Sequence, residues 1–250
     1  MKHVLAFIAV LTLLAVNSYA TPVNMGTAAH FGLLAGTTVT NIGSSKIKGH
    51  VGVAPGSAVT GFTPDMVDGT LYLATDAATL LAQNDLIDAY NQAAGALSPT
   101  VLTGQDLGAY NFGVLGPGVY FFSTQAQLTG DLTLDGQNNS DAQWIFQIGT
   151  ELTTAPHSKV KLKNGATSSN VFWQVGSSAT IGTDNDFAGN IMALTSISLN
   201  GGTLDGRALA RNGAVTISAA QTVNAVPEPS GIMALGMMLT SAAVWFRRKK

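Results

Sequence analysis

The sequence contains no cysteine among its 250 residues, and only 10% of its residues are charged. An exported chain without cysteine has no disulfides, so side-chain packing and backbone hydrogen bonds must hold it together. Basic residues are also few, and five of the 12 lysines and arginines lie at positions 2 and 247–250. Residues 21–229 keep 7 basic against all 14 acidic residues. This net charge of −7 argues against a nucleic-acid partner, which would require a basic patch.

Motifs of covalent chemistry are missing as well. The chain has no Gly-x-Ser-x-Gly, phosphate-binding loop or paired-carboxylate pattern, so we expect no enzymatic activity and no cofactor. Residues 135–141 and 184–186 are acidic, but neither has the spacing and closing glutamate of a calcium loop, which favours turns. His30, His50 and His157 are isolated in the sequence. We therefore predict no metal site and assign these histidines to structural or surface positions.

The N-terminus resembles a targeting segment. Residues 1–20 carry Lys2, an apolar run over 4–16 and small residues up to Ala20. That run is shorter than the ~20 residues of a membrane span, so the pattern predicts a secretory signal peptide, removed by signal peptidase after Ala20.

The C-terminus, residues 226–250, has three features in order. Pro227, Glu228 and Pro229 precede an apolar run over 231–246, and a basic cluster over 247–250 ends the chain. The run is marginal for a span, and basic residues stay on the cytoplasmic side, so one interpretation is a plain membrane anchor. The order of the features also resembles the PEP-CTERM sorting tail of Gram-negative bacteria. That resemblance implies cleavage near the motif by an exosortase and delivery to the cell surface or extracellular matrix.

Residues 21–225 are expected to form one domain built on a repeat. Thr180, Ser198 and Thr216 each stand between two apolar residues and are spaced 18 and 18 apart. Such alternation predicts short strands with the hydroxyl outward, and a constant period predicts a solenoid. The three hydroxyl residues would then form an outward ladder with neighbours about 4.8 Å apart. A second row keeps the same period, and residues 144–148 and 171–175 form a near repeat 27 apart.

A single helix is predicted over about residues 75–97. Asp76 near its start and Gly95 near its end suit the helix dipole and a C-terminal stop. We expect an apolar stripe to cover a flank of the solenoid. The residues assigned to this stripe are Leu80, Leu81, Ile87, Tyr90 and Ala94.

Ordered motifs extend over nearly all of residues 28–224. They are Gly-Pro-Gly-Val-Tyr at 116–120, Leu-Thr-Leu-Asp-Gly at 132–136, Ile-Phe-Gln-Ile-Gly at 145–149, Asn-Val-Phe-Trp-Gln-Val-Gly at 170–176, Phe-Ala-Gly-Asn-Ile-Met-Ala at 187–193 and Gly-Arg-Ala-Leu-Ala at 206–210. With these motifs the chain resembles the microbial ice-binding-protein-like family. The resemblance implies a mainly β fold, a right-handed parallel β-solenoid of triangular cross-section with one long α-helix packed alongside. It also implies that the C-terminal coil covers the N-terminal one, and that one flat face binds ice.

Candidate ice-binding residues follow from the ladder and the resemblance. They are Thr180, Ser198 and Thr216, the flanking Ser178, Ser196 and Ser218, and Thr60 and Thr63 in a Thr-Gly-Phe-Thr stretch. Thr37, Thr38 and Thr40 are added if the first coil joins the same face. The alternative is that threonine and serine simply suit the solvent side of strands.

Lys161 and Lys163 set a limit on this surface. If they occupied the next outward positions, their strongly hydrated ammonium groups would disrupt ordered water. Either they lie on another face, or the ice-binding face is short.

Two functions therefore compete. The first is a secreted or surface-sorted ice-binding protein, a monomer that inhibits ice growth or recrystallisation. The second is an extracellular matrix or adhesion protein that binds polysaccharide or a cell surface on the same scaffold. A polysaccharide-degrading enzyme is disfavoured, because such enzymes need clustered acid, base or metal residues.

Overall fold

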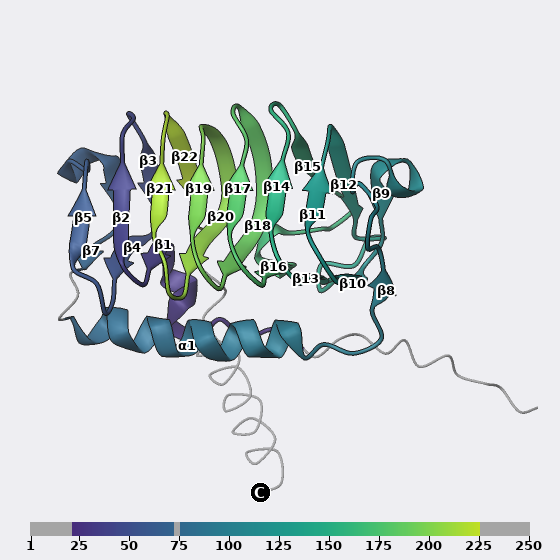
Figure 1. Ribbon diagram of the computed structural model, residues 1–250, viewed down its shortest axis with the longest axis horizontal. Helices are drawn as coiled ribbons and strands as arrows, with labels where there is room; N and C mark the ends of the chain where they lie inside the picture. The colour runs from purple at the N-terminus through teal and green to yellow at the C-terminus, as the bar shows by residue number, and fades with distance from the viewer. Residues whose placement is uncertain (1–21, 73–75, 226–250) are drawn as a thin grey trace, which may run out of the picture.

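The computed structural model describes residues 22–72 and 76–225 of the chain. Within them the protein is a parallel β-solenoid with three faces and one α-helix, α1 (Ala77–Ala94). Figure 1 shows the coils stacked along the long axis with α1 lying parallel to the stack along one edge. The predicted mainly β solenoid with one helix alongside is confirmed. The predicted signal peptide and sorting tail lie outside the described residues.

The first face is a separate sheet of seven parallel strands. In stack order the strands are β11 (Ala126–Leu128), β14 (Leu152–Thr154), β17 (Ala179–Ile181), β19 (Ile197–Leu199), β21 (Val215–Ile217), β2 (Thr38–Asn41) and β5 (Ala58–Thr60). We call its outward surface the hydroxyl face.

The other two faces belong to one fifteen-stranded sheet that bends at a corner. The helix-side face contains β8 (Thr100–Val101), β10 (Gly118–Phe122), β13 (Trp144–Ile148), β16 (Val171–Val175), the second halves of β18 (Asn185–Ala193) and β20 (Gly202–Ala210), β1 (Phe31–Ala35), β4 (His50–Val53) and β7 (Leu71–Tyr72). The charged face contains β9 (Val114–Leu115), β12 (Asp131–Asp135), β15 (Lys159–Lys163), the first halves of β18 and β20, β22 (Gln221–Asn224), β3 (Lys46–Lys48) and β6 (Val67–Asp68). Short 3₁₀ turns are η1 (Gly26–His30), η2 (Pro64–Met66), η3 (Tyr110–Gly113) and η4 (Ser168–Asn170).

The chain does not fill the stack in sequence order. The last strand of the hydroxyl face, β21, pairs with the first, β2, and β22 likewise pairs with β3. The two N-terminal coils therefore close one end of the stack, and the C-terminal coil packs on the inner side of the first of them. This confirms the expectation that the C-terminal coil covers the N-terminal one. The arrangement ties both halves of the chain into one cooperative unit through long-range pairing.

The interior is filled by aligned rows of apolar side chains. Aromatic rings stack between successive coils: Tyr120 on Phe146 at 5.4 Å and Phe146 on Trp173 at 3.9 Å between ring centroids. Parallel register places these residues opposite one another in β10, β13 and β16. Burial of such rings dominates core stability and holds the coils in register.

Helix α1 is shorter than predicted and shows a different side to the sheet. Asp76 caps its first turn by accepting a hydrogen bond from the Ala78 amide at 2.8 Å, and Gly95 ends it. Leu80 and Leu81 are 47% and 50% exposed, so the predicted apolar stripe is wrong except at Tyr90. Ile87 and Ala94 also lie outward. The buried positions are Thr79, Ala82, Gln83, Leu86, Ala89, Tyr90 and Ala93. Small alanines face the sheet because they let the helix backbone come close to the strands.

Two stacked glutamines join the helix to the sheet. Gln147 Nε2 donates to the carbonyls of Ala93, Ala94 and Ala96 at 2.9, 3.1 and 2.9 Å, at and just after the helix C-terminus, where carbonyls lack partners within the helix. Its register neighbour Gln174 donates to the Tyr90 hydroxyl at 2.7 Å. These are the glutamines of the near repeat, so that repeat encodes the docking of the helix as well as the strand.

Replacing Gln147 with leucine tests this joint. The change removes the one amide donor that the three carbonyls share, and we expect the free energy of unfolding to fall by about 1–3 kcal/mol. Urea denaturation followed by circular dichroism measures the loss. Gln125→Leu, at an exposed position, is the control and should change stability little. Equal stability of the Gln147 variant and the native protein would contradict the proposed joint.

Candidate functional site

Each strand of the hydroxyl face contributes one outward residue to a single row, and the seven residues lie in direct register. In stack order they are Gln127, Thr153, Thr180, Ser198, Thr216, Thr40 and Thr60. Six of the seven bear a hydroxyl. Seven strands at about 4.8 Å give a row about 29 Å long. We call this row the hydroxyl ladder.

The ladder points outward because its neighbours in each strand point inward. Ala179 and Ile181 flank Thr180 and are buried, and the same inward placement holds for the residues flanking Ser198 and Thr216. Period-2 alternation fixes this choice, since a slip by one residue would exchange the two sides. A dry, close-packed layer thus lies beneath the ladder and restricts the motion of its backbone.

The structure confirms the predicted adjacency of Thr180, Ser198 and Thr216, which pair in consecutive strands. The first coil joins the same face, so Thr40 and Thr60 extend the ladder. The Thr60 hydroxyl donates to that of Thr40 at 3.4 Å. Thr38 precedes Thr40 on the same side of β2, whereas Thr37 lies in the turn before the strand.

The other predicted residues lie beside the ladder or away from it. Ser178 and Ser196 precede their strands, and their Oγ atoms accept hydrogen bonds from the amides of Ser196 and Ala214 at 3.4 and 3.1 Å. Ser218 is exposed just after β21. Thr63 lies beyond β5, where its hydroxyl donates to Asp65 at 2.5 Å. Thr63 is therefore not part of the ladder.

Thr153 was not among the predicted residues, although it is the direct neighbour of Thr180. The 18-residue period does not reach it, because the coil that contains Thr153 is longer. The near repeat between 144–148 and 171–175 gives the spacing of this coil, and 27 residues before Thr180 is Thr153. That signal could have located it.

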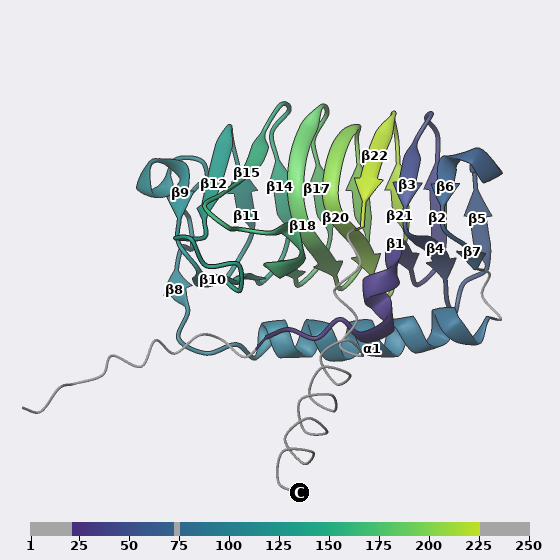
Figure 2. The same cartoon turned by 180° about the vertical axis from the view of Figure 1, so that it is seen from behind.

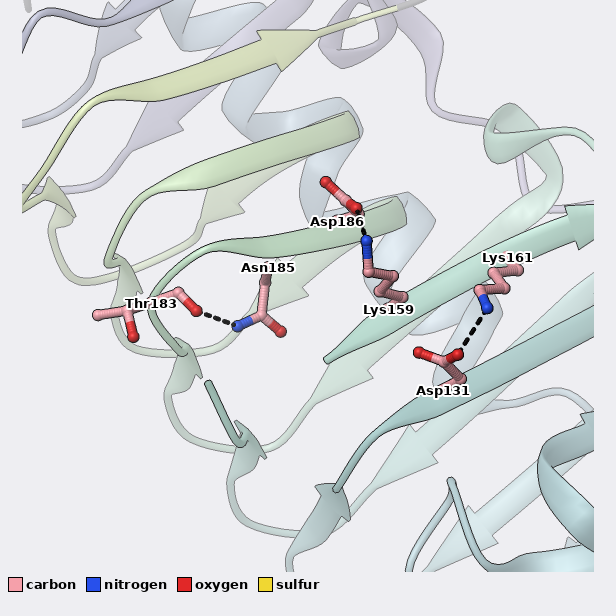
Figure 3. A network of polar contacts seen from close by, with 6 residues as sticks. All are labelled: Asp131, Lys159, Lys161, Thr183, Asn185 and Asp186. Atoms are coloured by element: carbon pink, nitrogen blue, oxygen red, sulfur yellow. Dashed lines mark hydrogen bonds and ion pairs between the residues drawn. The ribbon is translucent and has the colours of Figure 1, made fainter. Parts of the chain in front are cut away.

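Lys161 and Lys163 lie on the charged face, which settles the alternatives left open by the sequence. They belong to β15, which pairs with β12 and β18 and not with any strand of the hydroxyl face. Lys161 pairs with Asp131 at 2.5 Å and Lys159 with Asp186 at 2.6 Å (Figure 3). The hydrogen bond that Lys159 donates to Asp186, together with the charge of that carboxylate, raises the pKa of Lys159. Of the two alternatives, the lysines therefore lie on another face, and β14 occupies the position next to β17 in the stack.

The acidic turns and the histidines form no metal site among the residues that the structure describes. Asp184 lies in a turn with a left-handed backbone. Asn185 is buried and donates to the carbonyl of Ala155 at 3.1 Å. It also donates to the carbonyl of Thr183 at 3.1 Å (Figure 3). The rings of His30 and His50 lie 6.3 Å apart. Burial and the nearby His30 lower the pKa of His50.

The hydroxyl face differs from the charged face in electrostatics. No residue within its seven strands is charged, whereas β12 and β15 alone contribute two aspartates and three lysines to the opposite side. Glu151, exposed just before β14, is the carboxylate that flanks the hydroxyl face there. An uncharged row of hydroxyls offers water a regular set of weak hydrogen-bonding groups. Among the described residues, no helix combines the length and hydropathy needed to cross a membrane.

These features define a class: a three-sided β-solenoid that presents a regular uncharged surface on one face. Comparison with known proteins agrees. The family model described as Ice-binding-like matches residues 33–223. The chain belongs to this family.

Relatives and solved structures support the assignment along most of the chain. An ice-binding protein of Nostoc sp. (strain HG1) is 45% identical over 238 residues, covering 90% of this chain and 87% of the relative. One from Flavobacterium frigoris (strain PS1) is 35% identical over 78% of this chain and 74% of the relative. The crystal structure of an ice-binding protein from an Antarctic biological consortium superposes with a TM-score of 0.76 at 40% identity, covering 82% of this chain and 93% of that one.

Shortening a side chain in the buried layer beneath the ladder tests whether that layer supports the ladder. Ile197 is fully buried directly before Ser198, and Ile197→Ala should lower the free energy of unfolding by about 2–5 kcal/mol. Ile42→Ala is the matched control, since Ile42 is 71% exposed just after β2. Thermal and urea denaturation compare the two variants. Similar losses for both would contradict the assignment of Ile197 to the layer that supports the ladder.

Proposed function

We propose that the protein binds ice through the hydroxyl face. The observation that carries the proposal is the hydroxyl ladder itself: six hydroxyl residues in register across seven strands, with no charged residue in any of these strands. The names of the relatives and solved structures agree with it. The lysines that favoured a short face lie elsewhere, so the whole width of the sheet is available.

The physical basis is ordered water. Hydroxyl and small apolar groups at a fixed repeat can hold a water layer that merges with a crystal plane, whereas ammonium and carboxylate groups bind water too strongly and in other directions. Each contact is weak. A row about 29 Å long makes many contacts at once, and because the backbone beneath it is restrained, little conformational entropy is lost on adsorption. Adsorption of this kind stops local crystal growth and requires no covalent chemistry.

We also propose that the protein works outside the cell. Removal of residues 1–20 by signal peptidase and recognition of Pro227, Glu228 and Pro229 by an exosortase would place residues 21–225 at the surface or in the matrix. The absence of cysteine is compatible with this setting, since the fold relies on stacked strands. The competing matrix or adhesion function keeps the sorting tail in its favour but loses the support of the lysines, because Lys161 and Lys163 do not interrupt the hydroxyl face.

A charge at the centre of the ladder should abolish most of the activity. Ser198→Lys introduces an ammonium group whose desolvation costs several kcal/mol. Because each 1.4 kcal/mol is a factor of ten, the concentration needed to inhibit recrystallisation should rise by at least about tenfold. Thr203→Lys is the matched control on the charged face, beside Asp186. Equal inhibition by the Ser198 variant and the native protein would contradict the proposal.

Ice activity should also be independent of pH from about 5 to 9, because the strands of the hydroxyl face contain no titratable side chain. Recrystallisation assays across this range test the expectation, with circular dichroism as a check that the fold persists. A change centred near the ordinary histidine pKa of about 6.5 would show that a titrating group takes part in binding.

A further inference from the structure

The last described residue, Ala225, lies at a corner of the solenoid, and its position relative to the hydroxyl face matters for how the protein is attached. β22 runs along the charged face, and its last residue, Asn224, lies opposite Asp205 of β20. The residue after Asp205, Gly206, is the corner where β20 crosses to the helix-side face. Ala225 is thus at the same corner, and its amide donates to the carbonyl of Lys48 at 3.1 Å.

This corner is the edge of the solenoid farthest from the hydroxyl face. A three-sided stack has one edge opposite each face, and the edge between the charged and helix-side faces is opposite the third. The first described residues also lie away from the hydroxyl face. The Asn24 amide donates to Gln92 Oε1 of α1 at 2.9 Å, and the Thr27 amide donates to Asp85 at 2.6 Å. Figures 1 and 2 show α1 running along one margin of the stack, with the hydroxyl face toward the viewer in Figure 1 and the charged face toward the viewer in Figure 2.

The corner is open to solvent. A hollow of about 330 Å³ lies there, lined by His30, Lys48, His50, Asp68, Ala225 and nearby small residues. Only residues 226–230 separate Ala225 from the apolar run over 231–246. Five residues span at most about 18 Å, so a membrane or matrix that holds the apolar run also holds this corner close to it.

We propose that the protein acts while tethered at its C-terminal corner, with the hydroxyl face turned outward so that it fastens the tethering surface to ice. The inference rests on the proposed ice binding and on the predicted anchor. It holds whether the tail stays in the membrane or is exchanged for another attachment near Pro227, because the point of exit is the same. Many copies on one surface bind ice together, and the avidity of such an array exceeds that of one free molecule.

The native chain has no cysteine, so single cysteines report orientation directly. The full chain is reconstituted in phosphatidylcholine–phosphatidylglycerol vesicles that contain an acceptor-labelled lipid. Donor dyes are placed at Asp68→Cys, beside the exit corner, and in a second protein at Thr180→Cys, on the hydroxyl face. Energy transfer to the bilayer should be stronger from position 68 than from 180. Vesicles carrying unlabelled native protein should be captured by a growing ice surface, and empty vesicles should not.

A specific protease site inserted after Ala225 separates the possible failures. If vesicles are not captured while the released domain still inhibits recrystallisation, tethered adhesion is wrong and ice binding stands. Equal or stronger transfer from position 180, or a full chain that does not float with the vesicles, also overturns the tethered arrangement. A released domain without effect on ice overturns the proposed function instead, and energy transfer still decides the orientation.

Discussion

Parallel backbone pairing between coils is the constraint on which the whole structure depends. Each coil must place its strands directly against those of the next, because an unpaired buried backbone group costs about as much as a lost hydrogen bond. Coil length is free to vary so long as the strands meet in register. Coils here differ by nine residues between the Thr153–Thr180 and Thr180–Ser198 steps, yet all three residues belong to one ladder. Extra length is absorbed at the corners and on the other two faces, and the hydroxyl face remains regular.

The three faces of the solenoid have different surfaces and different roles. The helix-side face is covered by α1 through alanines and through Gln147 and Gln174, so its apolar surface is removed from water. The charged face carries surface ion pairs such as Lys159 with Asp186, which keep it hydrated and add little stability. The hydroxyl face has neither cover nor charge. Its surface can therefore meet a partner as wide and regular as itself, and a crystal of water is such a partner.

The sequence predicted the fold and the central residues of the candidate site, but not the full length of the ladder or the buried side of the helix. The 18-residue spacing of Thr180, Ser198 and Thr216 located three ladder positions, since those coils are uniform. It missed Thr153 and left the face of Lys161 undecided, because a single period cannot describe coils of unequal length. The helix was located, with Asp76 near its start, but its buried side was assigned to the larger leucines. Close approach to a sheet favours alanine, and that preference is visible only once the sheet is known to lie beneath the helix.

The claim that the seven-stranded sheet is the ice-binding surface is tested most directly by two single substitutions, one on the hydroxyl face and one on the charged face. Thermal hysteresis is measured for Thr153→Lys and for Lys161→Thr, two single changes that lie eight residues apart in the sequence but on different faces. We predict that Thr153→Lys loses most of the activity of the native protein and that Lys161→Thr keeps it. Loss of activity in the Lys161 variant, with full activity in the Thr153 variant, would contradict the account and move the site to the charged face.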